Sequence, residues 1–86
     1  MAIWPEWWQW QLELSSHLLK RMLDRSFSEI DLRLMMDRAR GLRKASEPGR
    51  WIVETNHDSM PWEVAVEPDK TDRLVVVITA YPVSEL

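Results

Sequence analysis

Cysteine is absent from this chain of 86 residues, and glycine occurs only at positions 41 and 49. The absence of cysteine excludes a disulfide scaffold and any thiolate metal site, and it fits a cytoplasmic protein. Two isolated glycines exclude a glycine-rich phosphate loop. His17 and His57 are the only histidines, and they show no metal-ligand spacing, so we expect neither a metal nor another cofactor.

Long apolar runs and a basic N-terminus are also missing. No segment approaches the ~18–20 apolar residues that a membrane span needs, so no membrane partner is expected. The first ten residues are aromatic but carry no Lys or Arg, which is unlike a signal peptide. A composition of 45% apolar and 29% charged residues predicts one globular domain over residues 1–86, with a Trp-rich N-terminal segment over residues 1–11.

Charge is distributed unevenly along the chain, whose net charge is −3. Residues 1–14 carry two acidic groups, residues 15–50 carry nine basic and five acidic groups, and residues 51–86 carry two basic and seven acidic groups. The basic middle segment suits a nucleic-acid partner. The alternative is an ordinary solvated helical face beside an acidic sheet edge.

Alternation and capping signals predict one strand and two helices in the first half of the chain. Apolar residues alternate over residues 8–14, which predicts a half-buried strand. Ser15 is an N-cap candidate for a helix over residues 16–25. Ser28 and Asp31 suggest a capping arrangement for a helix over residues 29–40, which Gly41 would end. This second helix is apolar on two sides, so it is either deeply buried or in contact with a partner.

The second half of the chain predicts three strands, over residues 50–56, 62–67 and 74–81, after a connecting loop over residues 42–49. The last of these strands is the most apolar and is expected at the centre of the sheet. The predicted fold class is α+β: an N-terminal strand, two helices, then a three-stranded antiparallel meander, with the helices on one face of the sheet.

Two groups of polar residues could carry chemistry. His17, Arg21 and Arg25 are spaced four residues apart and form one row on the first helix, beside its apolar stripe. Thr79 and Tyr81 alternate onto one face of the last strand, the face that we also assign to its valines at positions 75 and 77. We expect the two groups to converge where the helix meets the sheet.

Such a set suits RNA cleavage without a metal. His17 could take the proton of a ribose 2′-hydroxyl, while Arg21 and Arg25 could clamp phosphate oxygens. Tyr81 could position the phosphate or donate a proton, and Thr79 could add a hydrogen bond. The structural alternative is a polar boundary histidine, arginines on a solvated face, and ordinary strand composition.

Four stretches resemble an uncharacterised bacterial domain family over roughly residues 12–83. The first has a His, an Arg four residues on, a second Arg four further, and a Ser-Glu helix start, from His17 to Asp31. The others are Gly49-Arg50-Trp51 before a strand, Val66-Glu67-Pro68-Asp69, and Val77-Ile78-Thr79-Ala80-Tyr81. The family is similar to the superfold shared by barnase, EndoU, colicin RNases and RelE-like toxins.

The resemblance implies a toxin-like, metal-independent endoribonuclease, with RNA as substrate and an antitoxin-like protein as a partner. By position, it implies active roles for His17, Arg21, Arg25, Thr79 and Tyr81. The same resemblance makes Arg50 a further phosphate-ligand candidate.

The alternative function is a catalytically silent domain that binds a protein or a second copy of itself with the same fold. An open positive cleft shared by His17, Arg21 and Tyr81 would favour the enzyme. A buried Tyr81, with arginines paired to Glu54, Glu63 or Glu67, would favour the interaction domain.

The N-terminal tryptophans offer more aromatic surface than so small a domain easily covers. Trp4, Trp7, Trp8 and Trp10 are therefore predicted to form an interface, with a homodimer as one outcome. Packing in the core and stacking on bases are the alternatives.

Overall fold

The computed structural model describes residues 4–85, so residues 1–3 of the Trp-rich segment and residue 86 lie outside it. The elements follow in this order: η1 (Glu6–Gln9), β1 (Gln11–Leu14), α1 (Ser16–Asp24), α2 (Glu29–Asp37), β2 (Gly41–Lys44), β3 (Trp51–His57), β4 (Met60–Asp69), β5 (Leu74–Pro82) and η2 (Val83–Glu85). Here η denotes a short 3₁₀ helix.

The sheet has five strands in the order β1-β5-β4-β3-β2. Strand β1 runs parallel to β5, and the remaining neighbours are antiparallel. The predicted three-stranded antiparallel meander is therefore wrong, because β1 and β2 each add an edge strand and the sheet is mixed. Strand β4 is central, whereas the prediction placed the last strand there.

Strand β2 lies inside the segment that was predicted as a helix end and a loop. Helix α2 already ends at Asp37, with Arg38 as its C-cap, and Gly41 begins β2 opposite Glu54 on β3. A Cβ atom at Gly41 would collide with the Glu54 carboxylate. Gly41 therefore leaves room for the Glu54 side chain, and it does not end the helix as predicted.

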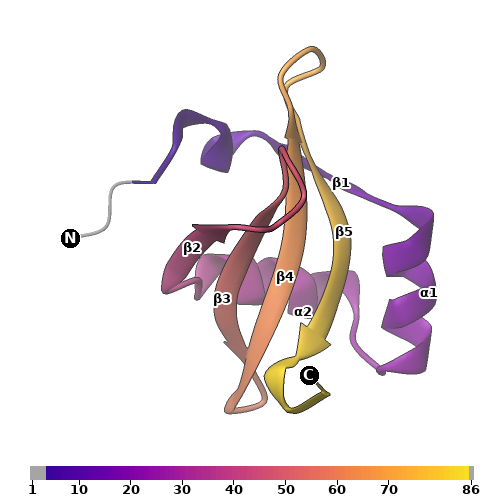
Figure 1. Cartoon of the computed structure of the whole chain (residues 1–86). Helices are drawn as coiled ribbons and strands as arrows, with labels where there is room; N and C mark the ends of the chain where they lie inside the picture. The colour runs from indigo at the N-terminus through magenta and orange to yellow at the C-terminus, as the bar shows by residue number, and fades with distance from the viewer. Residues whose placement is uncertain (1–3, 86) are drawn as a thin grey trace.

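Both helices begin at the predicted caps. The Ser15 hydroxyl accepts a hydrogen bond from the amide of Leu18 at 3.0 Å, and Ser28 and Asp31 form a complete capping box. Helix α2 crosses one face of the sheet, whereas α1 runs beside β5 at its margin (Figure 1). This differs from the predicted layering because β1 delivers the chain to the edge of the sheet immediately before α1 begins.

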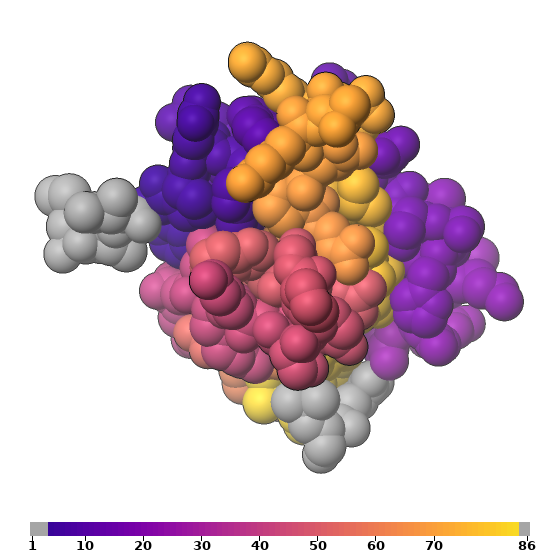
Figure 2. Space-filling view, turned by 45° about the horizontal axis from the view of Figure 1, so that its top comes forward, coloured from indigo at the N-terminus to yellow at the C-terminus, as the bar shows by residue number. Residues whose placement is uncertain are grey.

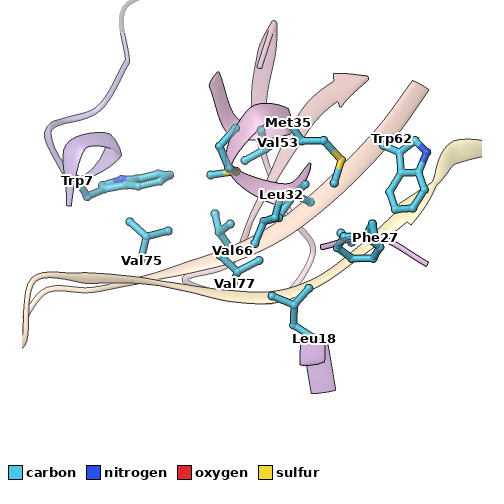
Figure 3. Close-up of a cluster of buried hydrophobic side chains, with 13 residues drawn as sticks. Trp7, Leu18, Phe27, Leu32, Met35, Val53, Trp62, Val66, Val75 and Val77 are labelled. Atoms are coloured by element: carbon cyan, nitrogen blue, oxygen red, sulfur yellow. The ribbon is translucent and has the colours of Figure 1, made fainter. Parts of the chain in front are cut away.

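The hydrophobic core fills the space between α2 and the sheet (Figure 3). Leu32 and Met35 of α2 are fully buried against strand valines. Trp7 closes one end of the core, and Phe27 packs edge-on against Trp62 at the other, with 5.3 Å between ring centroids. The opposite side of the sheet has no helix of residues 4–85 across it and is called the open face below (Figure 1).

Candidate active site on the open face

A β-bulge reverses the side-chain alternation in the middle of β5. Val77 pairs with Val66 and Thr79 pairs with Ala65, so Ile78 is an extra residue on β5. Val75 and Val77, before the bulge, are buried in the core, whereas Thr79 pairs with Ala65 on the open face. The prediction that Thr79 shares a face with those valines is therefore wrong, because simple alternation does not reveal a bulge.

Tyr81 belongs to a hydrogen-bonded cluster that spans four strands of the open face. Its hydroxyl donates to Oε1 of Glu63, directly opposite on β4, at 2.9 Å. Arg43 on β2 donates to Oε2 of Glu63 at 3.0 Å and to Oε2 of Glu54 at 2.7 Å. Tyr81, Glu63, Arg43 and Glu54 are called the Tyr81 cluster. Glu63 is only 8% exposed, so its carboxylate needs these donors.

The cluster fixes the protonation states of its two donors. Burial, together with the hydrogen bond and charge of Glu63, raises the pKa of Tyr81 to about 12. The hydrogen bond from Arg43 to Glu63, assisted by both glutamate charges, raises the pKa of the guanidinium. At neutral pH the cluster therefore presents a neutral phenol and a permanent cation around a carboxylate.

The first turn of α1 is attached to β5 at the bulge. The Ser15 amide donates to the Val77 carbonyl at 3.1 Å, and the Ser15 hydroxyl donates to the Ile78 carbonyl at 2.9 Å. His17 follows two residues later and is exposed. Tyr81 lies three residues beyond Ile78 on the same strand, roughly 10 Å along it. The convergence of His17 with Tyr81 stays a prediction.

The other residues of the predicted helix row differ in their surroundings. Arg21 is partly exposed and pairs with Asp24 at 3.1 Å, one turn along α1. Arg25 is the C-cap residue of α1, and its backbone amide donates to the Arg21 carbonyl at 2.9 Å. An incoming phosphate would therefore compete with Asp24 for Arg21.

Arg50 lies at a different part of the open face. Its guanidinium binds Glu67 of β4 through two contacts of 2.8 and 2.7 Å, and it reaches Glu47 at 3.9 Å. Glu67 is four residues from Glu63 on β4, which corresponds to roughly 13 Å. The structure therefore does not bring Arg50 into the Tyr81 cluster.

The tryptophans of the N-terminal segment pack at one end of the core. Trp7 is 8% exposed and lies 5.6 Å from the Trp51 ring, measured between centroids. Trp8 and Trp10 are half-buried against the core, and Trp4 stacks on Trp8 with centroids 4.6 Å apart. Trp7 thus has little surface for an interface, and the interface role of the others stays a prediction.

Two hollows of the surface lie away from the Tyr81 cluster. One of about 370 Å³ lies between the Trp-rich segment and the projecting β4–β5 turn (Figure 2), and it is lined by Glu6, Trp7, Trp10, Lys70 and Arg73. Another of about 320 Å³ lies at the β2–β3 loop.

Sequence reasoning missed Arg43 as a site residue and treated Glu63 only as a charge that could neutralise arginines. The available signal was a single charged residue within each of two apolar strand stretches, Glu54 and Glu63. These residues are directly opposite each other in the β3–β4 register, where two like charges need a cation between them. Arg43 supplies that cation from the edge strand that was predicted as loop.

One family model matches residues 14–82, from the end of β1 to the end of β5. It is described as a domain of unknown function, DUF4258. The chain belongs to the DUF4258 family. No curated protein and no solved structure matches it.

The DUF4258 match includes the Tyr81 cluster and the helix row, whereas the Trp-rich segment lies outside it. Among residues 4–85, no three His, Asp or Glu side chains are grouped as metal ligands would be. No helix within that range is long and apolar enough to cross a membrane.

Proposed function

We propose that this DUF4258 domain is a toxin-like endoribonuclease of the barnase/EndoU/colicin/RelE-like superfold that cleaves RNA in the cytoplasm without a metal. The observation that carries the proposal is the attachment of α1 at the β5 bulge. Ser15 holds the turn that contains His17 beside the strand segment that turns Thr79 and Tyr81 to the open face. Bulges commonly re-aim side chains next to active sites.

The reaction is an attack of the ribose 2′-oxygen on its own 3′-phosphate. His17 takes the 2′-hydroxyl proton as the new P–O bond forms, and Arg21 and Arg25 stabilise the charge on the phosphorane oxygens. The bond from phosphorus to the 5′-oxygen then breaks, and that oxygen takes a proton from the His17 imidazolium or from water. The products are a 2′,3′-cyclic phosphate and a 5′-hydroxyl.

Tyr81 acts in this proposal as a neutral hydrogen-bond donor, whose single hydroxyl proton turns from Glu63 to a phosphate oxygen when the substrate binds. A phenol with a pKa of about 12 is a poor proton source at neutral pH, so the sequence-based option of Tyr81 as the acid is not retained. Thr79 lies two residues earlier on the same face and adds a second hydroxyl.

A silent protein-interaction domain is the second candidate, favoured by the charge pairing on the open face. Arg43 lies between two glutamates, and Arg50 is held by Glu67. These pairs reduce the attraction of the open face for a polyanion, on which RNA affinity depends.

RNA cleavage in the presence of a chelator tests the enzyme directly. Purified protein should cut single-stranded RNA in EDTA and leave 2′,3′-cyclic phosphate ends. His17→Ala should lower the cleavage rate by about 100-fold or more, and Tyr81→Phe by roughly tenfold.

Lys70→Ala, an exposed cation in the distant β4–β5 turn, is the matched control and should leave the rate unchanged. Cleavage that requires magnesium, or that persists in both site variants, would contradict the mechanism. Absence of cleavage by the folded protein across RNA substrates, including translating ribosomes, would favour the interaction domain.

A further inference from the structure

The outer sides of α1 and α2 carry exposed aliphatic side chains. Leu19 and Leu23 of α1 are 49% and 83% exposed, and Ile30 and Leu34 of α2 are 72% and 41% exposed. Each pair is spaced four residues apart, so each forms a row along its helix. A helix that already packs its other side on the core normally presents polar residues outward, and apolar rows there mark a contact surface.

The rows belong to consecutive helices that are joined by four residues, 25–28. On α2 the exposed row lies about 160–200° around the helix from the fully buried Leu32, directly opposite the core. On α1 the row lies about 100–140° from the buried Leu18. Together, Leu19, Leu23, Ile30 and Leu34 are called the helical face.

The helical layer is basic although the chain as a whole is acidic. Residues 16–40 contain six Lys or Arg and four Asp or Glu, a net charge of +2, whereas residues 51–86 have a net charge of −5. Arg33 is paired with Glu29 on α2. Lys20 and Arg38 form no ion pair with a residue of the described range 4–85, and they remain available to an acidic partner.

We propose that the helical face is the docking site for an amphipathic helix of a partner protein, with aliphatic residues along one side and Asp or Glu flanking them. Rows with four-residue spacing are the usual anchors of a helix docked on an apolar surface. The surplus positive charge of residues 16–40 complements acidic flanks and disfavours a second copy of the same basic surface. The four anchors are all aliphatic and lack the Trp or Phe typical of helices that bind lipid.

A synthetic peptide probe tests this chemistry with the intact protein. The probe is a fluorescently labelled 20-residue helix with Leu at the a, d and e positions and Glu at its flanks. We expect saturable binding, by fluorescence anisotropy, at micromolar concentrations. A peptide with Lys in place of every Glu should bind at least about tenfold more weakly, because its charge opposes Lys20 and Arg38.

Two sets of variants connect binding to the surface. Leu23→Ser with Ile30→Ser should weaken the Glu peptide by about tenfold or more, whereas Met60→Ser, at an apolar residue that is 51% exposed at the start of β4, should not. Lys20→Glu with Arg38→Glu should shift the preference toward the Lys peptide. Circular dichroism checks that each variant is folded.

Three results would overturn the proposal. The first is failure of the Glu peptide to bind, or binding that ignores the Leu23/Ile30 substitutions. The second is a homodimer in sedimentation that those substitutions dissolve. The third is binding of the protein to phosphatidylserine–phosphatidylcholine vesicles that the Leu23/Ile30 substitutions abolish, which would assign the helical face to a membrane. None of these readouts depends on RNA cleavage.

Discussion

At the residue scale, the contact between Tyr81 and Glu63 joins a hydrogen-bond donor to a buried acceptor. Glu63 is almost fully buried and needs donors, and the phenol can donate only while it keeps its proton. The contact therefore favours the protonated form of the Tyr81 phenol, whose pKa it raises. Replacement of either should disturb both.

Tyr81 is the only tyrosine in the chain, so tyrosinate absorbance reports its titration alone. We expect a midpoint near pH 12 in the folded protein, above the usual value of about 10. Because folding raises this pKa, its contribution to stability is full below about pH 10 and is lost as pH rises toward 12. Glu63→Gln should lower the midpoint, and a midpoint near 10 in a folded wild-type protein would contradict the contact.

The sequence was sufficient to place Tyr81 and Thr79 on the last strand, but it could not assign their face. Alternation assigns each residue of a strand to the face opposite that of its neighbour. The extra residue Ile78 reverses this assignment for the residues after it, and no residue type in the sequence reveals the change. Arg43 and Glu63 were missed for a related reason. Their contact depends on the register between β2, β3 and β4, which no local pattern encodes.

At the element scale, the C-terminal turn of α2 depends on a strand residue. The Met35 carbonyl lies in the last turn of the helix, where carbonyls lack helical partners, and it accepts a hydrogen bond from the Thr55 hydroxyl of β3. Thr55 is fully buried. This contact ties α2 to the sheet at a point where the sequence predicted that the helix would continue.

Thr55→Val should destabilise the protein by about 1–3 kcal/mol, because it keeps the shape and leaves a buried carbonyl without its donor. Denaturant unfolding followed by circular dichroism measures the change. Thr71→Val, in the exposed β4–β5 turn, should change the free energy of unfolding by less than about 0.5 kcal/mol. Equal effects of the two substitutions would show that the Thr55 bond contributes nothing.

Element positions were predicted well where a cap marks them. The alternation over residues 8–14 predicted a longer strand than the structure has, because β1 begins only at Gln11, after the 3₁₀ helix Glu6–Gln9. The caps at Ser15 and Ser28 are confirmed, and both helices start at the expected residues. The strand β2 escaped prediction because four residues are too few to show a period, and because Gly41 at the end of an apolar helix resembles a helix stop. Only the position of Gly41 against the Glu54 side chain reveals the role of this glycine.

At the scale of the whole molecule, the Trp-rich segment closes the core although it lies outside the family match. Trp7 covers the end of the cluster beside Val75, and β1 joins that segment to the sheet edge (Figure 3). The predicted association surface is thus in part an internal surface of the domain.

Trp7→Ala should destabilise the fold by about 3–5 kcal/mol, the usual cost of deleting a large buried aromatic side chain. Trp4→Ala removes a ring that stacks on the half-buried Trp8, and it should cost roughly 1 kcal/mol. Denaturant unfolding followed by far-ultraviolet circular dichroism measures both changes in the free energy of unfolding. A smaller loss for Trp7→Ala than for Trp4→Ala would mean that the segment does not pack on the core in solution.

The parallel pairing of β1 with β5 also sets an order of events during folding. Gln11 pairs with Leu74, so β1 cannot pair until a segment more than sixty residues later in the chain is available. Contacts between distant parts of a chain close slowly, whereas the β3–β4–β5 hairpins need only nearby residues. On a ribosome, Trp7 and Leu18 would stay exposed until β5 emerges, which makes the nascent chain a substrate for chaperones through most of its synthesis.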